Sequence, residues 1–171
     1  MAMAKLLLRK DPPVSYNFMV ALAPSTPLGP SVTGALALAS LGVDAAFTQI
    51  SGLGVQLNYN TVRSGGSNNE VFHLPGGVNR GALTLKRGLA SFTSPLMRWC
   101  LGMASGSKTI EPKTIVIMLM DKNPYLPPVM TWMLYNAIPV KWEIDELDSK
   151  KSDIVIESIE LVFSNMDVVG L

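Results

Sequence analysis

Charged side chains are scarce in this sequence. Asp, Glu, Lys and Arg make up 16% of the 171 residues, whereas roughly 25% is usual for a soluble domain. The formal net charge of +1 gives no field that would draw the chain to nucleic acid or to an acidic membrane surface. With 48% hydrophobic residues, a monomer would expose large neutral or apolar patches, which usually mark contact surfaces. The composition therefore favours obligate assembly, and a monomer of low solubility is the alternative.

Cysteine and histidine each occur once. The single Cys100 excludes an intrachain disulfide and fits synthesis in a reducing cytosol. We expect it to be a core residue rather than a nucleophile. His73 has no nearby cluster of cysteines or carboxylates, and a zinc site needs three or four ligands. We therefore predict no metal site.

Long apolar runs and catalytic motifs are also missing. The longest apolar run, around 35–41, is far shorter than the ~20 residues of a membrane-spanning helix. Residues 6–8 are too short a core for a secretory signal. The serines lack a nucleophile elbow, and no glycine pair is followed by the Lys-Ser/Thr of a phosphate-binding loop. Acidic residues over 145–153 are interspersed with lysines, as in a solvated loop. We therefore expect neither an enzyme nor a cofactor.

The most informative stretch predicts a long hairpin and then a third strand. Apolar and polar uncharged residues alternate over 55–60, which is the period of a strand with one apolar face and one wet face. Small residues over 64–68 predict a loop, after which 70–74 resumes an extended run. Residues 75–77 (Pro-Gly-Gly) are expected to break this second arm. Alternation returns over 82–86 and predicts the next strand.

One helix is predicted after this strand. Ser91 or Ser94 can cap its start, Pro95 suits its first turn, and it should end near Gly106. Its apolar face, which we expect to pack on a sheet, consists of Leu96, Trp99, Cys100 and Met103.

The remaining elements are predicted to be strands and loops. Residues 24–42, rich in Pro, Ser, Thr, Gly and Ala, predict a loop insertion. Pro139 lies inside a strand-like run and should mark a sheet edge, a bulge or a crossing between sheets. The other strands are predicted at about 16–22, 43–50, 114–120, 129–135 and 154–163, the last being the final strand.

A series of short motifs runs in a fixed order from about Tyr16 to Phe163. In this order and with these gaps the sequence resembles the tail-tube family of contractile phage tails and phage-like injection particles. The motifs are Ser51-Gly52-Leu53, Gly65-Gly66-x-x-Asn69, Leu74-Pro75-Gly76, Leu83-x-Leu85-Lys86-Arg87-Gly88, Trp132, Asn136-Ala137-x-Pro139-Val140-Lys141-Trp142 and Ile156-Glu157-Ser158-Ile159-Glu160-Leu161.

The resemblance implies a mainly β fold, an antiparallel β-sandwich or partly open β-barrel with one flanking α-helix, that closes into a ring-shaped hexamer. Length alone fits a single domain over 1–171, with an N-terminal arm at 1–14. Ring closure would remove the liability of open sheet edges. The insertion at 24–42 departs from the family pattern and is either a passive surface loop or an extra contact with a neighbouring ring or baseplate component.

The implied function is structural. Stacked rings would form the inner tube of a contractile injection system or phage tail, and the chain would be either the main tube or the adaptor ring between spike hub and tube at the baseplate. Its implied partners are itself and neighbouring tube, sheath, spike-hub or baseplate proteins, with no nucleic-acid recognition and no stable membrane anchor. It would be made in the bacterial cytoplasm and become part of a phage tail or a released injection particle.

Two sets of residues are expected to carry this role. The polar uncharged face of Gln56, Asn58 and Asn60 should line the lumen, because a channel that passes cargo should be wet and weakly adhesive. Charges around the hairpin should be exposed at a contact rim, where they fix register and partner choice; solvated strand ends are the alternative. The predicted interface residues are Arg63, Ser64, Gly65, Gly66, Ser67, Asn68, Asn69, Glu70, Lys86 and Arg87.

Two other functions stay open. A β-sandwich module that binds sugar or peptide would normally present aromatic residues on loops, but aromatics are only 7% and fall mostly in strand or helix patterns. A small hydrolase would need a general base, which the sequence does not offer. Formation of rings distinguishes the tube subunit from both.

Overall fold

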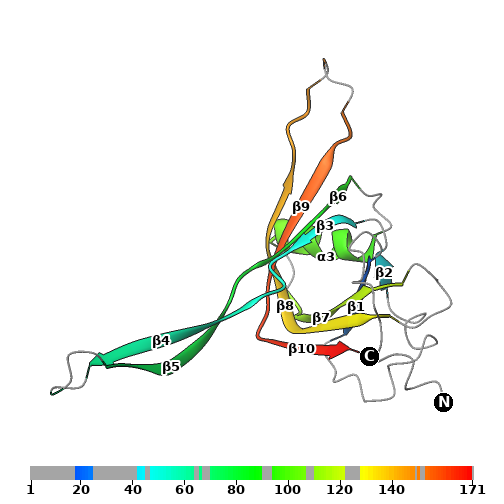
Figure 1. Cartoon of the computed structure of the whole chain (residues 1–171). Helices are drawn as coiled ribbons and strands as arrows, with labels where there is room; N and C mark the ends of the chain where they lie inside the picture. Colours follow the sequence, from blue (N-terminus) through cyan, green and yellow to red (C-terminus); the bar gives the residue numbers. More distant parts are fainter. Residues whose placement is uncertain are drawn as a thin grey trace, which may run out of the picture.

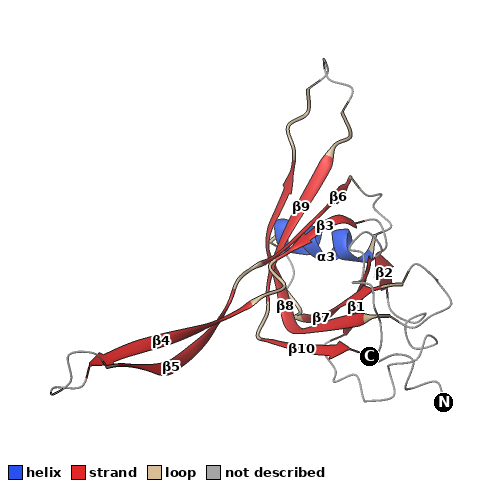
Figure 2. Cartoon of the chain, viewed as in Figure 1, coloured by secondary structure: helices blue, strands red, loops and turns tan. Residues whose placement is uncertain are grey.

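The computed structural model describes residues 18–24, 42–44, 47–63, 66, 70–89, 94–106, 110–121, 128–148, 150 and 153–170, so the predicted N-terminal arm and residues 25–41 of the insertion lie outside the described residues. Within this part the chain is mainly β with one helix, as predicted (Figures 1 and 2). The elements are β1 Phe18–Pro24, β2 Gly42–Asp44, β3 Phe47–Ser51, β4 Val55–Arg63, β5 Val71–Arg80, β6 Leu83–Gly88, α3 Pro95–Ala104, β7 Lys113–Leu119, β8 Met130–Ile144, β9 Ile156–Val162 and β10 Asn165–Gly170.

Strand β8 joins the two halves of the main sheet. Its first part pairs with β7 on one side and β10 on the other, and its second part pairs with β9. The strand order is β2-β1-β7-β8-β9-β6-β3, with β10 added beside β8, and every pairing is antiparallel. A single long strand therefore belongs to both layers of the body.

The backbone of β8 changes direction where it passes between the layers. Asn136 has a φ of 51°, a left-handed conformation that asparagine tolerates better than most residues. The pairing with β9 then shifts between Pro139 and Lys141. Pro139 was predicted to mark a sheet edge, a bulge or a crossing between sheets, and the last two are confirmed. The pairing of β8 passes from β7 to β9 just before Pro139, and the register shift follows directly after it.

The core forms where the two layers and the helix meet. Alternate residues of β7 and β8, such as Ile115 and Leu134, face residues such as Leu85 and Ile159 from the other layer. Leu96 and Cys100 of α3 enter the same cluster. The continuous apolar run of β7 also buries its second face, where Val116 and Met118 pack with Ala21. This explains why that strand lacks the alternation of a half-wet strand.

Helix α3 has the predicted start and apolar face. Ser94 is its N-cap and accepts a hydrogen bond from the Met97 backbone N–H at 3.2 Å, and Pro95 occupies the first turn. Of the predicted face, Leu96 and Cys100 are buried, whereas Trp99 and Met103 are partly exposed.

Two predicted boundaries are wrong. The strand predicted over 43–50 is two strands, because β2 pairs with β1 in one layer whereas β3 pairs with β6 in the other. The strand ending near Phe163 is not the last, since β10 follows it and forms an edge beside β8. The short break between β9 and β10, at Phe163 and Ser164, gave too weak a pattern to predict a further strand.

Candidate assembly surface

The β4–β5 hairpin projects from the body as a long arm (Figure 1). Its two strands pair only with each other in the described sheets, and every residue of β4 and all of β5 except Arg80 are exposed. A lone two-stranded hairpin is only marginally stable in water. The described body therefore does not bury the side chains of the arm.

Close packing at the base of the arm sets where it leaves the body. Gly52 has a φ of +92°, and a Cβ there would lie 2.2 Å from the carbonyl oxygen of Ala82. Only glycine suits such a position. On the other strand, Arg80 Nη2 donates to Asn165 Oδ1 at 3.1 Å, which ties β5 to the start of β10.

Residues 75–77 form a bulge and do not break the second strand as predicted. Strand β5 continues through them, but the pairing moves from Leu57 opposite Val78 to Tyr59 opposite Pro75. Gly76 and Gly77 thus face Asn58 alone. A Cβ on Gly76 would lie 3.0 Å from the Asn58 carbonyl oxygen, which is tighter than an ordinary contact, so the close approach of the two backbones favours a glycine there.

The predicted lumen residues lie together on one face of the arm near the body. Gln56 is directly opposite Asn79, and Asn58 follows on the same face of β4. Asn60 shares this face but lies opposite Leu74. Asn79 was missed by the sequence analysis, because the bulge obscures which face of β5 it occupies. The four residues form a polar uncharged face whose contact with a lumen stays a prediction.

The apolar face beside it is not buried in the chain's own core. Val55, Leu57 and Tyr59 are each more than half exposed. Tyr59 makes an edge-on contact with the His73 ring, at 5.0 Å between ring centroids, and the Thr61 hydroxyl lies 3.4 Å from His73 Nδ1. His73 therefore serves the packing of the arm.

Most of the predicted contact charges are accessible. Arg63 and Glu70 are exposed at the far end of the arm, and Lys86 is exposed on β6. Gly66 is an exposed turn residue. The other predicted tip residues, Ser64, Gly65, Ser67, Asn68 and Asn69, lie outside the described residues.

Arg87 is the exception. The prediction that it is an exposed charge at a contact rim is wrong. Both Arg87 and its cross-strand partner Glu157 are fully buried, and Arg87 Nε donates to Glu157 Oε1. Arg87 Nη2 also donates to Ser94 Oγ at 2.8 Å. The guanidinium lies over the Phe47 ring, with Cζ 4.8 Å from its centroid. Arg87 thus joins β6, β9, β3 and the start of the helix.

A second polar surface, which the sequence analysis missed, covers the outer face of β3, β6, β9 and the end of β8. The registers place two cross-strand rows there, Gln49–Lys86–Ser158–Glu143 and Ser51–Thr84–Glu160–Lys141. Lys141 Nζ lies 2.7 Å from Glu143 Oε2, and this hydrogen bond lowers the pKa of Glu143 and raises that of Lys141. Unlike the polar face of Gln56, Asn58 and Asn79 on the arm, this face is charged.

A match to a known family identifies the kind of protein that carries these surfaces. Residues 14–167 match the family described as T4-like virus tail tube protein gp19. The chain belongs to this tail-tube family. The resemblance inferred from the short motifs is thereby confirmed.

Solved structures of related assemblies have the same fold as this tail-tube protein. A chain of the anti-feeding prophage baseplate, in a 6-fold symmetrised cryo-EM structure, is 30% identical, with 94% of this chain and 97% of that chain covered and a TM-score of 0.75. A chain of the PVC extracellular contractile injection system, from the sheath–tube complex in the extended state, is 21% identical, with coverages of 100% and 99% and a TM-score of 0.72. No curated protein sequence matches significantly.

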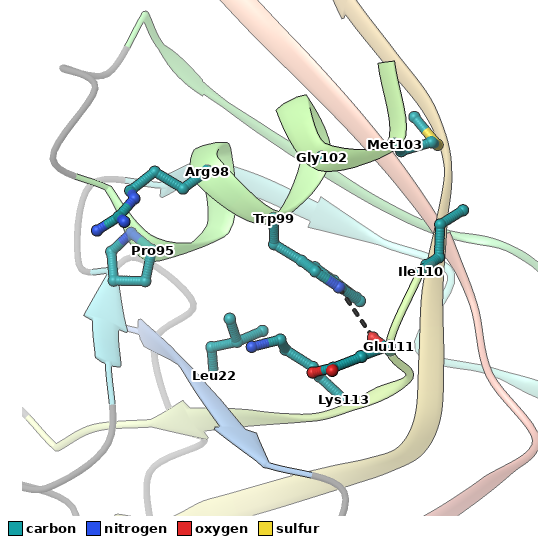
Figure 3. Close-up of a pocket in the computed structure, with 9 residues that line it drawn as sticks. All are labelled: Leu22, Pro95, Arg98, Trp99, Gly102, Met103, Ile110, Glu111 and Lys113. Atoms are coloured by element: carbon teal, nitrogen blue, oxygen red, sulfur yellow. Dashed lines mark hydrogen bonds between the residues drawn. The ribbon is translucent and has the colours of Figure 1, made fainter. Parts of the chain in front are cut away.

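The tail-tube protein also has a hollow beside its helix (Figure 3). The hollow has a volume of about 730 Å³. Its only aromatic ring among the described residues is Trp99, whose Nε1 donates to the Glu111 carbonyl oxygen at 3.0 Å. The described part of its lining thus lacks the several stacking rings expected of a sugar-binding module. Its described lining is Leu22, Pro95, Arg98, Trp99, Gly102, Met103, Ile110, Glu111 and Lys113.

Titratable side chains in the described part do not assemble into a metal-binding group. No cluster of three or more His, Cys, Asp or Glu is placed to hold an ion among those residues. Burial, and then the charge of Glu157, raise the pKa of the Cys100 thiol to about 12. This thiol therefore stays protonated and unreactive near neutral pH. No helix in the described residues is long and apolar enough to cross a membrane.

Proposed function

We propose that this tail-tube protein is a ring-forming subunit of the inner tube of a contractile injection system or phage tail. Hexameric rings of it would stack into a hollow conduit. The observation that carries the proposal is the arm, which exposes large apolar side chains in a chain that belongs to a tail-tube family. Such a surface is stable in water only when a neighbour covers it.

The position we propose for the ring is the baseplate end of the tube, as an adaptor between spike hub and tube. The support is the 30% identity to a chain of the anti-feeding prophage baseplate, against 21% to a chain of the PVC sheath–tube complex. In this position its partners would be tube, sheath, spike-hub or baseplate proteins. A place in the main tube is the alternative, and the particle would be a phage tail or an extracellular injection system.

The arm would supply both the wall and the contacts of this ring. Gln56, Asn58 and Asn60 would face the channel, and the hairpin tip at 64–69 would reach the adjacent ring. Arg63, Glu70 and Lys86 would lie at subunit contacts, where exposed charges set partner choice more than affinity. Arg87 is withdrawn from this set because its side chain is enclosed. This structural role requires no catalytic group.

Size and shape in solution test the proposal. Light scattering of the purified chain should give a mass of about 110 kDa, which is that of a hexamer of the 18.4 kDa chain. Negative-stain images should show rings with a central hole. A chain that stays monomeric at high micromolar concentration would contradict it. A binding module or a hydrolase would behave in that way.

A further inference from the structure

The face of the arm that is mainly apolar near the body differs from the face that is mainly apolar near the tip. Near the body, one face carries Val55, Leu57 and Val78, while the other carries Gln56 and Asn79. Beyond Tyr59 three of the four large apolar residues lie on the opposite face, which is the face of Gln56. There Val62 pairs with Phe72, and Leu74 follows on the same face of β5. The fourth, Val71, stays on the first face, opposite Arg63 at the end of the arm.

The bulge produces this exchange on β5. Leu74 and Val78 are four residues apart, so a regular strand would put both on one face. Because Gly76 and Gly77 together face Asn58, the alternation moves by one residue. Leu74 consequently lies opposite Asn60, on the polar face of β4, whereas Val78 lies opposite Leu57. On β4 the exchange follows from the sequence itself, since Asn60 and Thr61 are two polar residues in succession.

We infer that copies of this chain bury opposite faces of the arm on the two sides of the bulge. Val55, Leu57, Tyr59 and Val78 would be covered near the body, and Val62, Phe72 and Leu74 would be covered near the tip. The inference rests on the proposed ring assembly. Gln56, Asn58 and Asn79 would stay in water.

The exposure of these side chains and the symmetry of a related assembly argue for a second copy as the occupant. The seven apolar residues are each between 46% and 63% exposed, and a large exposed apolar patch usually marks a contact surface. Neither patch faces the described body, and the matched baseplate chain comes from an assembly with 6-fold symmetry. In a closed symmetric ring each copy both offers an arm and receives one, so one sequence must satisfy both sides of the contact.

Two pairs of adjacent positions test the exchange by thiol labelling. Leu57→Cys and Gln56→Cys sample opposite faces near the body, and Phe72→Cys and His73→Cys sample opposite faces near the tip. All four positions are exposed in the isolated chain. The native Cys100 gives no background because it is buried. The probe is N-ethylmaleimide, and mass spectrometry follows its addition to the dissociated chain and to the assembled rings.

Assembly should slow labelling at positions 57 and 72 by about ten-fold or more, and leave positions 56 and 73 nearly unchanged, because thiol reactivity follows access. Protection of 57 and 73 together would show one continuous buried face and overturn the inference. Equal labelling of all four in well-formed rings would overturn it too, since no copy would then cover the arm. If the chain never assembles, the proposed function is wrong together with this inference. If rings form but the labelling pattern differs, only this inference is wrong.

Hydroxyl-radical footprinting uses the unmodified chain, so it tests the inference even if the cysteine variants do not assemble. Assembly should reduce oxidation of Leu57 and Phe72, which lie on opposite faces, and leave His73 unchanged. Reduced oxidation of Leu57 and His73 with Phe72 unchanged would contradict the exchange.

Discussion

Arg87 and Glu157 face each other directly across β6 and β9 and form an ion pair that is fully enclosed by the chain. The pair is held from several sides. Ser94, which caps α3, accepts from Arg87, and Trp142 Nε1 lies 3.4 Å from the second carboxylate oxygen of Glu157. The sheet, the end of β8 and the helix therefore share one polar network inside an otherwise apolar core.

Arg87→Met should lower the free energy of unfolding by about 3–5 kcal/mol, because it leaves the Glu157 carboxylate buried without its cation. Urea unfolding followed by tryptophan fluorescence measures this loss. The double replacement Arg87→Met/Glu157→Met is the control. It should recover much of the stability, since two apolar side chains of similar size need no compensation. A loss below about 1 kcal/mol in the single variant, or a double variant no more stable than the single one, would show that the pair is not an enclosed unit.

Gly52→Ala should cost about 1–3 kcal/mol and reduce ring formation, because the new Cβ meets the Ala82 carbonyl at the base of the arm and the positive φ is strained for alanine. Gly54→Ala is a matched control two residues away, where a Cβ meets nothing within 4 Å. Thermal unfolding and light scattering report the two effects. If both variants behave alike, Gly52 does not determine how the arm leaves the body.

The stability of the protein should fall above pH 9 because of Cys100. Its pKa is about 12 in the folded chain, against 9.0 for a free thiol, so the folded state keeps a proton that the unfolded state loses. The stabilisation is complete below pH 9 and is lost between pH 9 and 12. The free-energy difference between wild type and Cys100→Ala should change by up to ~1.4 kcal/mol per pH unit in that range. Parallel stability curves from pH 8 to 10.5 would contradict the burial of this thiol.

Arg63→Glu should impair ring formation while changing the free energy of unfolding by less than ~1 kcal/mol, because Arg63 is an exposed charge near the tip of the arm. Lys150→Glu makes the same charge change on the β8–β9 loop, away from the arm. Light scattering compares the assembly of the two variants. Equal assembly would place the contact rim elsewhere.

The sequence predicted elements whose signals are local. The helix follows from Ser94, Pro95 and an apolar stripe, and the hairpin follows from alternation around small residues. The fate of Arg87 could not be predicted in this way, because its burial depends on Glu157, seventy positions away on another strand. Side-chain type alone favours the surface for an arginine.

The faces of the arm show a second limit. Alternation over 55–60 correctly predicts a strand with two unlike faces, but it cannot show what covers the apolar one. It also cannot show that Leu74 and Val78 lie on opposite faces, since that depends on the pairing of a bulge with Asn58. Register across strands is a tertiary property, and a shift of one residue reverses every face.

A cryo-EM reconstruction of rings of the full chain tests the central claim most directly. It should show a channel wall that includes Gln56, Asn58 and Asn79, with Leu57 and Tyr59 packed against a neighbouring copy. A channel lined only by the charged face of Lys86, Lys141 and Glu143, with the arm free on the outside, would contradict the account.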